Sequence, residues 1–341
     1  MTQVREHLDV FPFVTAPRVL RRVESNLLTR AQPGPMGPLW SEVVPIDVVH
    51  FDQTYTKQPF AAPRFLYEGL HGRIEWQQMD FRQPFYHRNL DVDEMSYQIA
   101  GDRTLMTEYG TAELRTGDFV RIPVGVCHDN WGRQESHILW YLPEPCLERL
   151  PAQRTTQALI PPFEGWQAAT VNELITDCMG SAGGHDTAAQ RSDERLILED
   201  ALSHNERLAV VRPSSGAPTG DRPRNIEWIW TGASSSIGMV NSGVSAGLDY
   251  IRHRNADEIQ YQASGHRLLV TQHGVVEVVP GDFARIPIGV AFTSISTEPN
   301  RYIATVSYHR LPRVYEASRE SELWSAQDVE SRRSAVLQSA R

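Results

Sequence analysis

The sequence contains little cysteine, and none of it has the spacing of a disulfide framework or a cysteine metal site. The three cysteines are Cys127, Cys146 and Cys178, and no CxxC pair occurs. An odd number of isolated cysteines argues against a disulfide-stabilised secreted scaffold and favours a reducing compartment. We therefore expect the protein to be cytoplasmic.

Long apolar runs and basic clusters are also missing. No apolar run approaches the ~20 residues that a membrane helix needs. The first residues, MTQVREHLDVFPF, contain acidic residues where a signal peptide would need a continuous apolar core. The 33 basic and 42 acidic residues give a formal net charge of −9, without a basic run that would follow a phosphate backbone. We expect a soluble protein that binds neither membranes nor nucleic acid.

A β pattern is present instead. The 341 residues are 40% hydrophobic, which allows two domains with buried cores, and scattered glycine and proline suit short strands joined by turns. Runs of strand-forming residues occur at Met95–Ile99, Thr104–Glu108, Ala112–Leu114, Phe119–Ile122 and His137–Leu142. Strands at this regular spacing predict a sandwich or a barrel.

The β pattern occurs twice in the chain. The segment HRNADEIQYQASGHRLLVTQHGVVEVVPGDFARIPIGV, from His253, repeats HRNLDVDEMSYQIAGDRTLMTEYGTAELRTGDFVRIPVGV, from His87. Matched glycines and prolines lie 164 residues apart (265 − 101, 281 − 117 and 287 − 123). A repeat of this length is a whole domain, because solenoid units are roughly 20–50 residues long. The sequence therefore predicts a tandem of two β domains.

The remaining segments are predicted to carry a few helices. Val171, Leu174, Ile175 and Cys178 have helical spacing and Gly180 would end that helix, so a helical linker is expected there. A second helix is expected over Val19–Leu28, in an N-terminal arm. This arm either packs on a barrel or on another subunit, or it is a disordered tail. The C-terminal tail is either a helix that docks on the protein or a frayed end. The predicted order is an arm (1–60), the first β domain (61–150), the linker (151–204), the second β domain (205–313) and a helical tail (314–341).

Three side chains of the first repeat, His87, Glu94 and His128, form a candidate metal site. Side chains alternate along a strand, and a closed sheet brings strands that are distant in sequence to one interior point. Pro123 and Gly125 allow the chain to bend so that the His128 imidazole meets the other two groups. Two imidazoles and one carboxylate form a facial triad, which leaves one side of a divalent metal open, whereas a structural zinc site needs a fourth tight ligand.

The second repeat keeps only part of this set. His253, Asn255 and Glu258 are present, but the carboxylate is shifted and Phe292 stands where the first repeat has His128 (128 + 164). We expect the second domain to hold no metal and to have a structural role.

The spacings of the first repeat resemble the two signature motifs of the cupin superfamily. The first motif contains His87, Asn89, Glu94 and Gly101, with Asn89 where cupins usually carry histidine, and the second contains Gly117, Pro123, Gly125 and His128. The resemblance implies an all-β fold of tandem double-stranded β-helix (cupin, jelly-roll) barrels with a few accessory helices.

Within this superfamily, FYHRN followed by a carboxylate resembles homogentisate 1,2-dioxygenases, and the tandem arrangement resembles gentisate and hydroquinone 1,2-dioxygenases. The resemblance implies a non-haem Fe(II) dioxygenase that cleaves the ring of a hydroquinone-type substrate with O2. It makes His87, Glu94 and His128 the iron ligands and Asn89 a weak ligand or a group behind them. Mn(II) or another divalent ion is an alternative metal, because affinity alone does not select iron.

Further candidates lie beside the trio. Gln98 shares the Glu94 face of its strand, and it either binds a substrate hydroxyl or forms a hydrogen bond to the backbone. Any of His137, Trp140 and Tyr141 that faces inward would line a pocket, and otherwise it packs in the core. Cys127 is expected to point away from the metal as a core thiol. We count Asn89, Gln98 and Trp140 as candidate catalytic residues.

Two other classes of function are open at this point. One is a different metal-dependent cupin enzyme, either a diketone- or flavonol-type C–C cleaving dioxygenase or an isomerase; the other is a cupin that binds a small molecule without turnover. An oxygenase consumes O2 with its substrate, an isomerase works anaerobically, and a binding protein does neither. We expect a homo-oligomer, with or without a second subunit.

Overall fold

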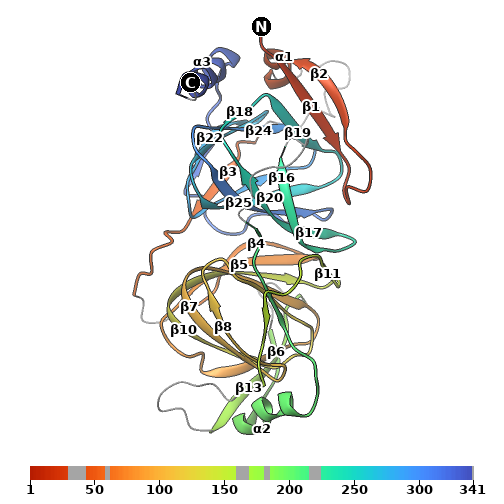
Figure 1. The fold of residues 1–341 in the computed structure, drawn as a ribbon, viewed down its shortest axis with the longest axis vertical. Coiled ribbons are helices and arrows are strands. Elements are labelled where there is room, and N and C mark those ends of the chain that lie inside the picture. The colour runs from red at the N-terminus through yellow and green to blue at the C-terminus, as the bar shows by residue number, and fades with distance from the viewer. Residues whose placement is uncertain (30–43, 58–61, 159–168, 180–184, 215–223, 340–341) are drawn as a thin grey trace. The chain divides into compact units, whose positions relative to one another are not determined.

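The computed structural model describes residues 1–29, 44–57, 62–158, 169–179, 185–214 and 224–339. The chain divides into two compact units, each a β barrel (Figure 1). Unit 1 consists of Met1–Asp52, Ser214–Arg310 and Glu316–Arg341, and unit 2 of Gln53–Pro213 and Leu311–Tyr315. The predicted all-β fold with tandem barrels and a few helices is confirmed.

Unit 2 is built around two 15-residue strands, β7 (Asp93–Thr107) and β10 (His128–Leu142), which pair with each other along their length. Its other main strands are β4 (Arg64–Gly69), β5 (Gly72–Met79), β6 (Phe85–Asn89), β8 (Gly110–Arg115), β9 (Phe119–Ile122), β12 (Arg154–Thr155), β13 (Thr170–Asp177), β14 (His185–Asp193) and β15 (Ala209–Val211). A short helix, α2 (Glu194–Glu199), and a 3-10 turn, Asp200–Leu202, follow β14.

The two long strands bend, and the bends turn one sheet into the two faces of a jelly roll. The C-terminal part of β10 and the N-terminal part of β7 pair with β5 and β9, whereas the other halves pair with β6 and β8. Gly101 has a φ of 66° at the bend of β7, and a Cβ there would lie 2.4 Å from the Gln134 carbonyl oxygen. This position needs glycine because both the φ angle and the close approach exclude a side chain.

Unit 1 repeats this arrangement with shorter strands. They are β1 (Gln3–Asp9), β2 (Arg18–Val23), β3 (Asp47–His50), β16 (Asn225–Thr231), β17 (Ser235–Ser242), β18 (Ser245–Ala246), β19 (Asp249–His253), β20 (Asp257–Ser264), β21 (Arg267–Thr271), β22 (Gly274–Val278), β23 (Asp282–Ile286), β24 (Phe292–Ser296), β25 (Asn300–Ser307) and β26 (Arg319–Glu320). Two helices belong to it, α1 (Glu24–Leu28) and α3 (Ala326–Ser339).

Each barrel is completed by a hairpin from the other half of the sequence. In unit 2, β13 lies parallel to β6 and pairs with β14, while in unit 1 β1 lies parallel to β19 and pairs with β2. The N-terminal arm is therefore part of the C-terminal barrel, and the segment between the two β domains is part of the N-terminal barrel.

Two helix predictions are corrected by this pairing. The helix expected over Val171–Cys178 is wrong, because this segment forms β13, whose backbone pairs with a strand on either side. Gly180, expected to end that helix, lies outside the described residues. The helix expected over Val19–Leu28 exists only at α1, because Arg18–Val23 pairs with β1 as β2. Hydrophobic spacing alone did not separate these strands from helices.

The C-terminal tail docks on unit 1, which decides between the two predicted alternatives. Val329 and Val336 of α3 are buried in a core cluster with Val4 and Leu27. Arg333 of the same helix forms a buried ion pair with Glu24. None of the helices in the described ranges is long and apolar enough to cross a membrane.

Candidate metal centre

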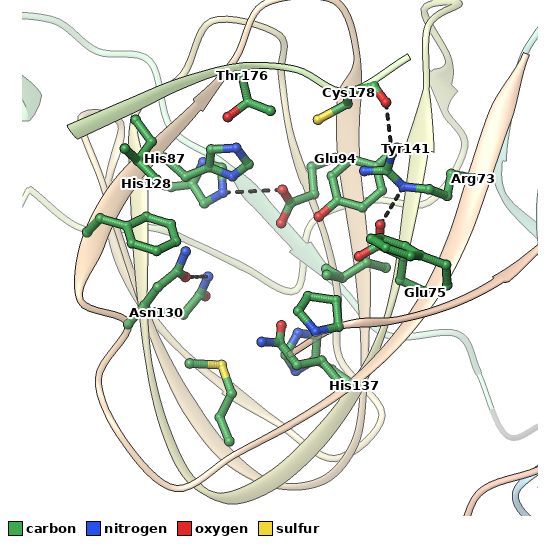
Figure 2. Close-up of a pocket in the computed structure, with 18 of the residues that line it drawn as sticks. Arg73, Glu75, His87, Glu94, His128, Asn130, His137, Tyr141, Thr176 and Cys178 are labelled. Carbon is green, nitrogen blue, oxygen red and sulfur yellow. Dashed lines mark hydrogen bonds and ion pairs between the residues drawn. The ribbon is translucent and has the colours of Figure 1, made fainter. Parts of the chain in front are cut away.

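The bends of unit 2 bring the three predicted ligands together in the barrel interior (Figure 2). His87 lies on β6, Glu94 near the start of β7 and His128 at the start of β10, where it pairs in register with His87. One ligand atom of each side chain lies within 4.8 Å of the other two. Strands from three parts of the sequence thus supply one compact donor set.

The orientation of His128 leaves one ring nitrogen for a metal. Its Nδ1 lies 3.1 Å from the backbone oxygen of Val126, which accepts only, so Nδ1 carries the proton. Its Nε2 faces the Glu94 carboxylate at 3.3 Å. A backbone carbonyl that fixes the tautomer in this way is a common support for a metal-binding histidine.

Glu94 is held in its ionised form. Burial alone would raise the pKa of its carboxyl, but the imidazoles of His128 and His87 and the amide of Asn89 outweigh burial and lower that pKa to about 2. The Asn89 Nδ2 donates to the carboxylate at 3.1 Å. Burial lowers the pKa of the His128 imidazole, but the neighbouring Glu94 carboxylate raises it by more, so the net change is an increase. A divalent cation would take over the role of the proton shared by this pair.

The donor set fits a divalent metal that keeps open coordination positions. Two imidazole nitrogens and one carboxylate suit iron or manganese, and no cysteine lies in the group. The ligands border a cavity of about 410 Å³ with aromatic and aliphatic walls. Its lining includes Phe65, Met79, Phe81, Phe85, Leu139 and Leu174, together with the polar Arg73, Glu75, Gln77, Asn130, His137, Tyr141, Thr176 and Cys178.

One wall of the cavity follows from strand register. Tyr141 of β10 pairs with Glu94 on one side and Arg73 on the other, and His137 pairs with Gln98 and Gln77. Arg73 forms a buried ion pair with Glu75, and its guanidinium lies 4.6 Å from the centre of the Tyr141 ring. The wall therefore presents charged and aromatic groups in rows across β7, β10 and β5.

His137 and Tyr141 face the cavity, whereas the three candidate catalytic residues lie around it and not on its surface. Asn89 is buried behind Glu94, and its Oδ1 accepts from the Cys178 thiol at 3.0 Å. Gln98 donates to Glu135 at 2.7 Å and is fully buried. Trp140 alternates with the cavity residues on β10 and is buried on the other face of the strand, so it does not border the cavity. Catalytic roles for these three remain predictions.

Sequence reasoning missed several cavity residues. Arg73 and Glu75 alternate in the strand GRIEWQQM, so their common face was readable once that strand was assigned. Thr176 and Cys178 come from β13 and its end, and the incorrect helix assignment there concealed them. Cys127 was placed correctly: it is buried, and its thiol faces Glu173 at 3.6 Å.

The equivalent position in unit 1 contains an arginine. The Arg224 guanidinium donates to Glu258 at 2.5 and 2.6 Å and lies 3.4 Å from His253 Nε2, which is itself 2.7 Å from Glu258. Phe292, in place of a third ligand, has its ring centre 5.9 Å from that of His253. Burial opposes the charge of Arg224, yet Glu258 raises its pKa, and the carboxyl pKa of Glu258 is lowered in turn. The two remaining donors of the set are thus bonded to a cationic side chain.

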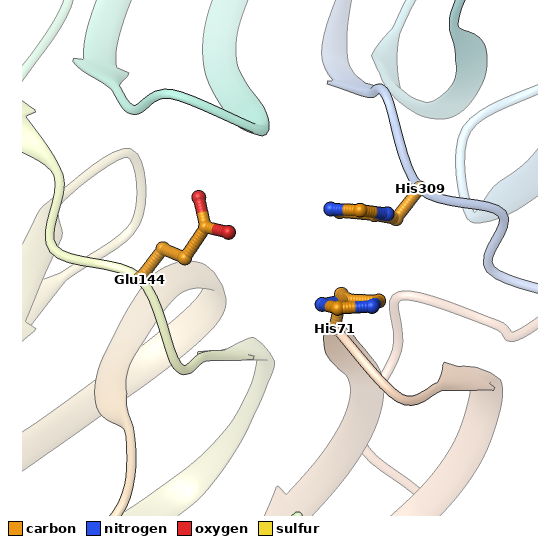
Figure 3. A group of neighbouring side chains, drawn as sticks. All are labelled: His71, Glu144 and His309. Atoms are coloured by element: carbon orange, nitrogen blue, oxygen red, sulfur yellow. The ribbon is translucent and has the colours of Figure 1, made fainter.

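A second group of histidine and glutamate side chains is drawn in Figure 3. His71 lies in the turn between β4 and β5 and Glu144 follows β10, both in unit 2, whereas His309 follows β25 in unit 1. Because the group draws on both units, we assign it no function.

No family model and no curated protein matches the sequence. Among solved structures, the chain is similar to a cupin 2 conserved barrel domain protein from Leptotrichia buccalis (TM-score 0.49, 9% identity, 78% of this chain and 98% of that chain). It is also similar to a mutant of Bacillus subtilis oxalate decarboxylase (0.45, 12%, 80% and 80%) and to AerE from Microcystis aeruginosa (0.40, 10%, 73% and 98%). We base the fold on the strand pairing and the function on the site itself.

Proposed function

We propose that unit 2 is a non-haem Fe(II)-dependent dioxygenase that cleaves the ring of a hydroquinone-type substrate with O2. The observation that supports this most is the three-donor set of His87, Glu94 and His128, which borders a cavity of about 410 Å³ with aromatic and aliphatic walls. A closed structural site would need a fourth tight ligand, and an apolar cavity beside open positions suits an organic ring.

The side chains of unit 2 would hold the iron and prepare the ring. When bound, Fe(II) would supply sites for the substrate hydroxyl and O2 and would lower the pKa of that hydroxyl. Glu94 contributes one negative charge and an ionised hydroxyl a second, which together balance the charge of the metal. The walls at Phe65, Phe85 and Leu139 would orient the ring and exclude bulk water.

Oxygen uptake tests the proposal. The protein is loaded anaerobically with Fe(II), Mn(II) or Zn(II) and mixed with hydroquinone, gentisate or homogentisate in an oxygen-electrode cell. We expect one O2 consumed per ring opened with Fe(II) and none with Zn(II), whose redox state does not change. Product formation without O2 would identify an isomerase, and binding without either would identify a binding protein; both results contradict the proposal.

A further inference from the structure

A buried carboxylate–imidazole pair lies in the wall of the unit 2 cavity, apart from the three metal donors. His137 Nδ1 is 2.9 and 3.1 Å from the two carboxylate oxygens of Glu135. Glu135 also accepts from the Gln98 Nε2 at 2.7 Å. All three residues are at most 1% exposed, and only His137 borders the cavity. The pair is therefore a preorganised group with one polar atom for a ligand.

That atom is an acceptor. Because the carboxylate of Glu135 can only accept, Nδ1 of His137 carries the proton and Nε2 has a free lone pair. Burial lowers the pKa of the His137 imidazole, and the Arg103 guanidinium lowers it further, against the opposing effect of Glu135. The neutral ring is thus favoured, and Nε2 accepts a hydrogen bond from a hydroxyl group.

The pair and the metal donors lie at separate positions along one face of the wall. Tyr141 pairs with Glu94, and His137 lies four residues before it on β10, so the two rows are about 13 Å apart along the strand. Figure 2 shows the imidazoles of His87 and His128 at one end of the group and His137 at the other. His137 and the three metal donors border the same cavity of about 410 Å³.

We propose that His137, positioned by Glu135, binds the second hydroxyl of the substrate, on the side of the ring opposite the metal-bound hydroxyl. This inference rests on the proposed function and names the residue that recognises the hydroxyl para to the metal-bound one. The distal hydroxyl donates to Nε2, while the ring lies against the apolar walls. An ionised carboxylate in the same place would face a lone pair and the charge of Glu135, so the site selects against it.

Anaerobic calorimetric titration of the Fe(II)-loaded protein tests this role without turnover. Hydroquinone is compared with phenol, which lacks the distal donor and adds no bulk, and with 4-methoxyphenol, which keeps the oxygen but not its proton. Leaving Nε2 unpaired in a buried site weakens binding, so we expect hydroquinone to bind about 10- to 100-fold more tightly than phenol. In His137→Leu this preference should fall to about one, and His137→Gln, which keeps an acceptor, should retain part of it.

The matched control is His266→Leu, the same substitution at an exposed histidine of unit 1, which should keep the full preference. Metal content is measured in each variant, and we expect one Fe(II) per chain throughout. A full preference for hydroquinone in metal-loaded His137→Leu would overturn the role of His137.

If His137→Leu does not fold, the ligand series on the unsubstituted protein decides. Equal binding of hydroquinone, phenol and 4-methoxyphenol, with O2 uptake intact, would overturn the distal hydroxyl site alone. Absence of binding by all three phenols, together with no O2 uptake, would overturn the proposed function itself.

Discussion

In unit 2 the carboxylate of Glu94 faces two imidazoles and a cavity, whereas in unit 1 the carboxylate of Glu258 is bonded to the guanidinium of Arg224. A buried carboxylate needs a cationic partner, because an isolated buried charge is strongly destabilised. In unit 1 the side chain of Arg224 is that cation. The donor set of unit 2 includes no such side chain, and a bound divalent metal would complete its charge balance.

The framework around both positions is nevertheless the same. Arg88 donates to the Gly125 carbonyl and to Glu108, and Arg252 donates to the Gly289 carbonyl and to Gln272. Buried tyrosine–glutamate–arginine groups recur as well, formed by Tyr86, Glu194 and Arg82 in unit 2 and by Tyr250, Glu24 and Arg333 in unit 1. The barrel framework therefore does not depend on the metal site, and substitutions should separate the two.

The largest effect is expected from Glu94→Ala. This change removes the only carboxylate of the donor set, so metal binding and turnover should be lost, with activity reduced by at least about 10³-fold. Elemental analysis of the Fe(II)-reconstituted protein measures the metal. His253→Ala in unit 1 is the control and should leave the metal content unchanged; full metal in Glu94→Ala would show that the site assignment is wrong.

Removal of the internal cation of unit 1 should give the next largest effect. Arg224, whose side chain is 10% exposed, is the guanidinium partner of the fully buried Glu258, so Arg224→Ala should destabilise unit 1 by about 3–5 kcal/mol. Urea unfolding followed by hydrogen exchange and mass spectrometry reports each unit separately.

The matched control is Arg195→Ala, since Arg195 forms a solvent-exposed pair with Glu199 whose loss should leave stability almost unchanged. The iron content of unit 2 should be unchanged in both variants. Equal stability losses in the two would mean that Arg224 is not needed to neutralise Glu258.

The sequence was sufficient to predict the β class, the repeat and the grouping of the three candidate ligands, because these depend on local patterns. Alternation along strands and matched glycines mark the barrel twice, and His87, Glu94 and His128 stand at motif spacing. The hairpins were missed because β13 has apolar residues at helical spacing, and its partner β6 lies about 90 residues earlier in the chain (Leu174 pairs with His87, 174 − 87).

Arg224 could not be predicted for a related reason. It precedes Glu258 by 34 residues and belongs to no motif, so only the closed barrel shows that its guanidinium reaches the carboxylate. Glu135 and His137 lie two residues apart on one strand, so alternation alone places them on one face, but the bond from Gln98 to Glu135 joins positions 37 residues apart and follows only from the strand pairing. Contacts that depend on bends and closure follow from tertiary structure, not from periodicity.

A smaller effect is expected from two combined substitutions that should convert unit 1 into a second metal centre. In Arg224→Ala with Phe292→His, the cation is removed and the missing imidazole is restored beside His253 and Glu258. Elemental analysis should show the metal content rising from one to two ions per chain. The added ion should also recover about 3 kcal/mol of unit 1 stability at a hundredfold excess over its dissociation constant.

Phe292→His alone is the control for this conversion. The guanidinium of Arg224 still bonds to Glu258 in that variant, so the metal content should remain at one ion per chain. A second ion in the single variant would contradict the assignment of the guanidinium as the group that opposes metal binding in unit 1.

The smallest effect is expected in the pH dependence of the two units. Burial raises the pKa of the Glu75 carboxyl from 4.5 to about 7, against the opposing effect of Arg73, with small increases from Glu94 and Glu68. Between these pH values the folded state holds a proton that the unfolded chain has lost, so stability is greatest at low pH and falls as pH rises toward 7. The slope is at most about 1.4 kcal/mol per pH unit for one group.

Unit 1 has Met239 in the place of Glu75 (75 + 164) and lacks this titration. Hydrogen exchange in urea at pH 5 and pH 7.5 should therefore show unit 2 losing stability relative to unit 1. Glu75→Gln should reduce that difference, but not abolish it, because burial also raises the pKa of Asp129 to about 7 despite its Arg82 partner. Asp102→Asn, at an exposed carboxyl on β7, is the control; an equal reduction there would mean that the difference does not come from buried carboxyls.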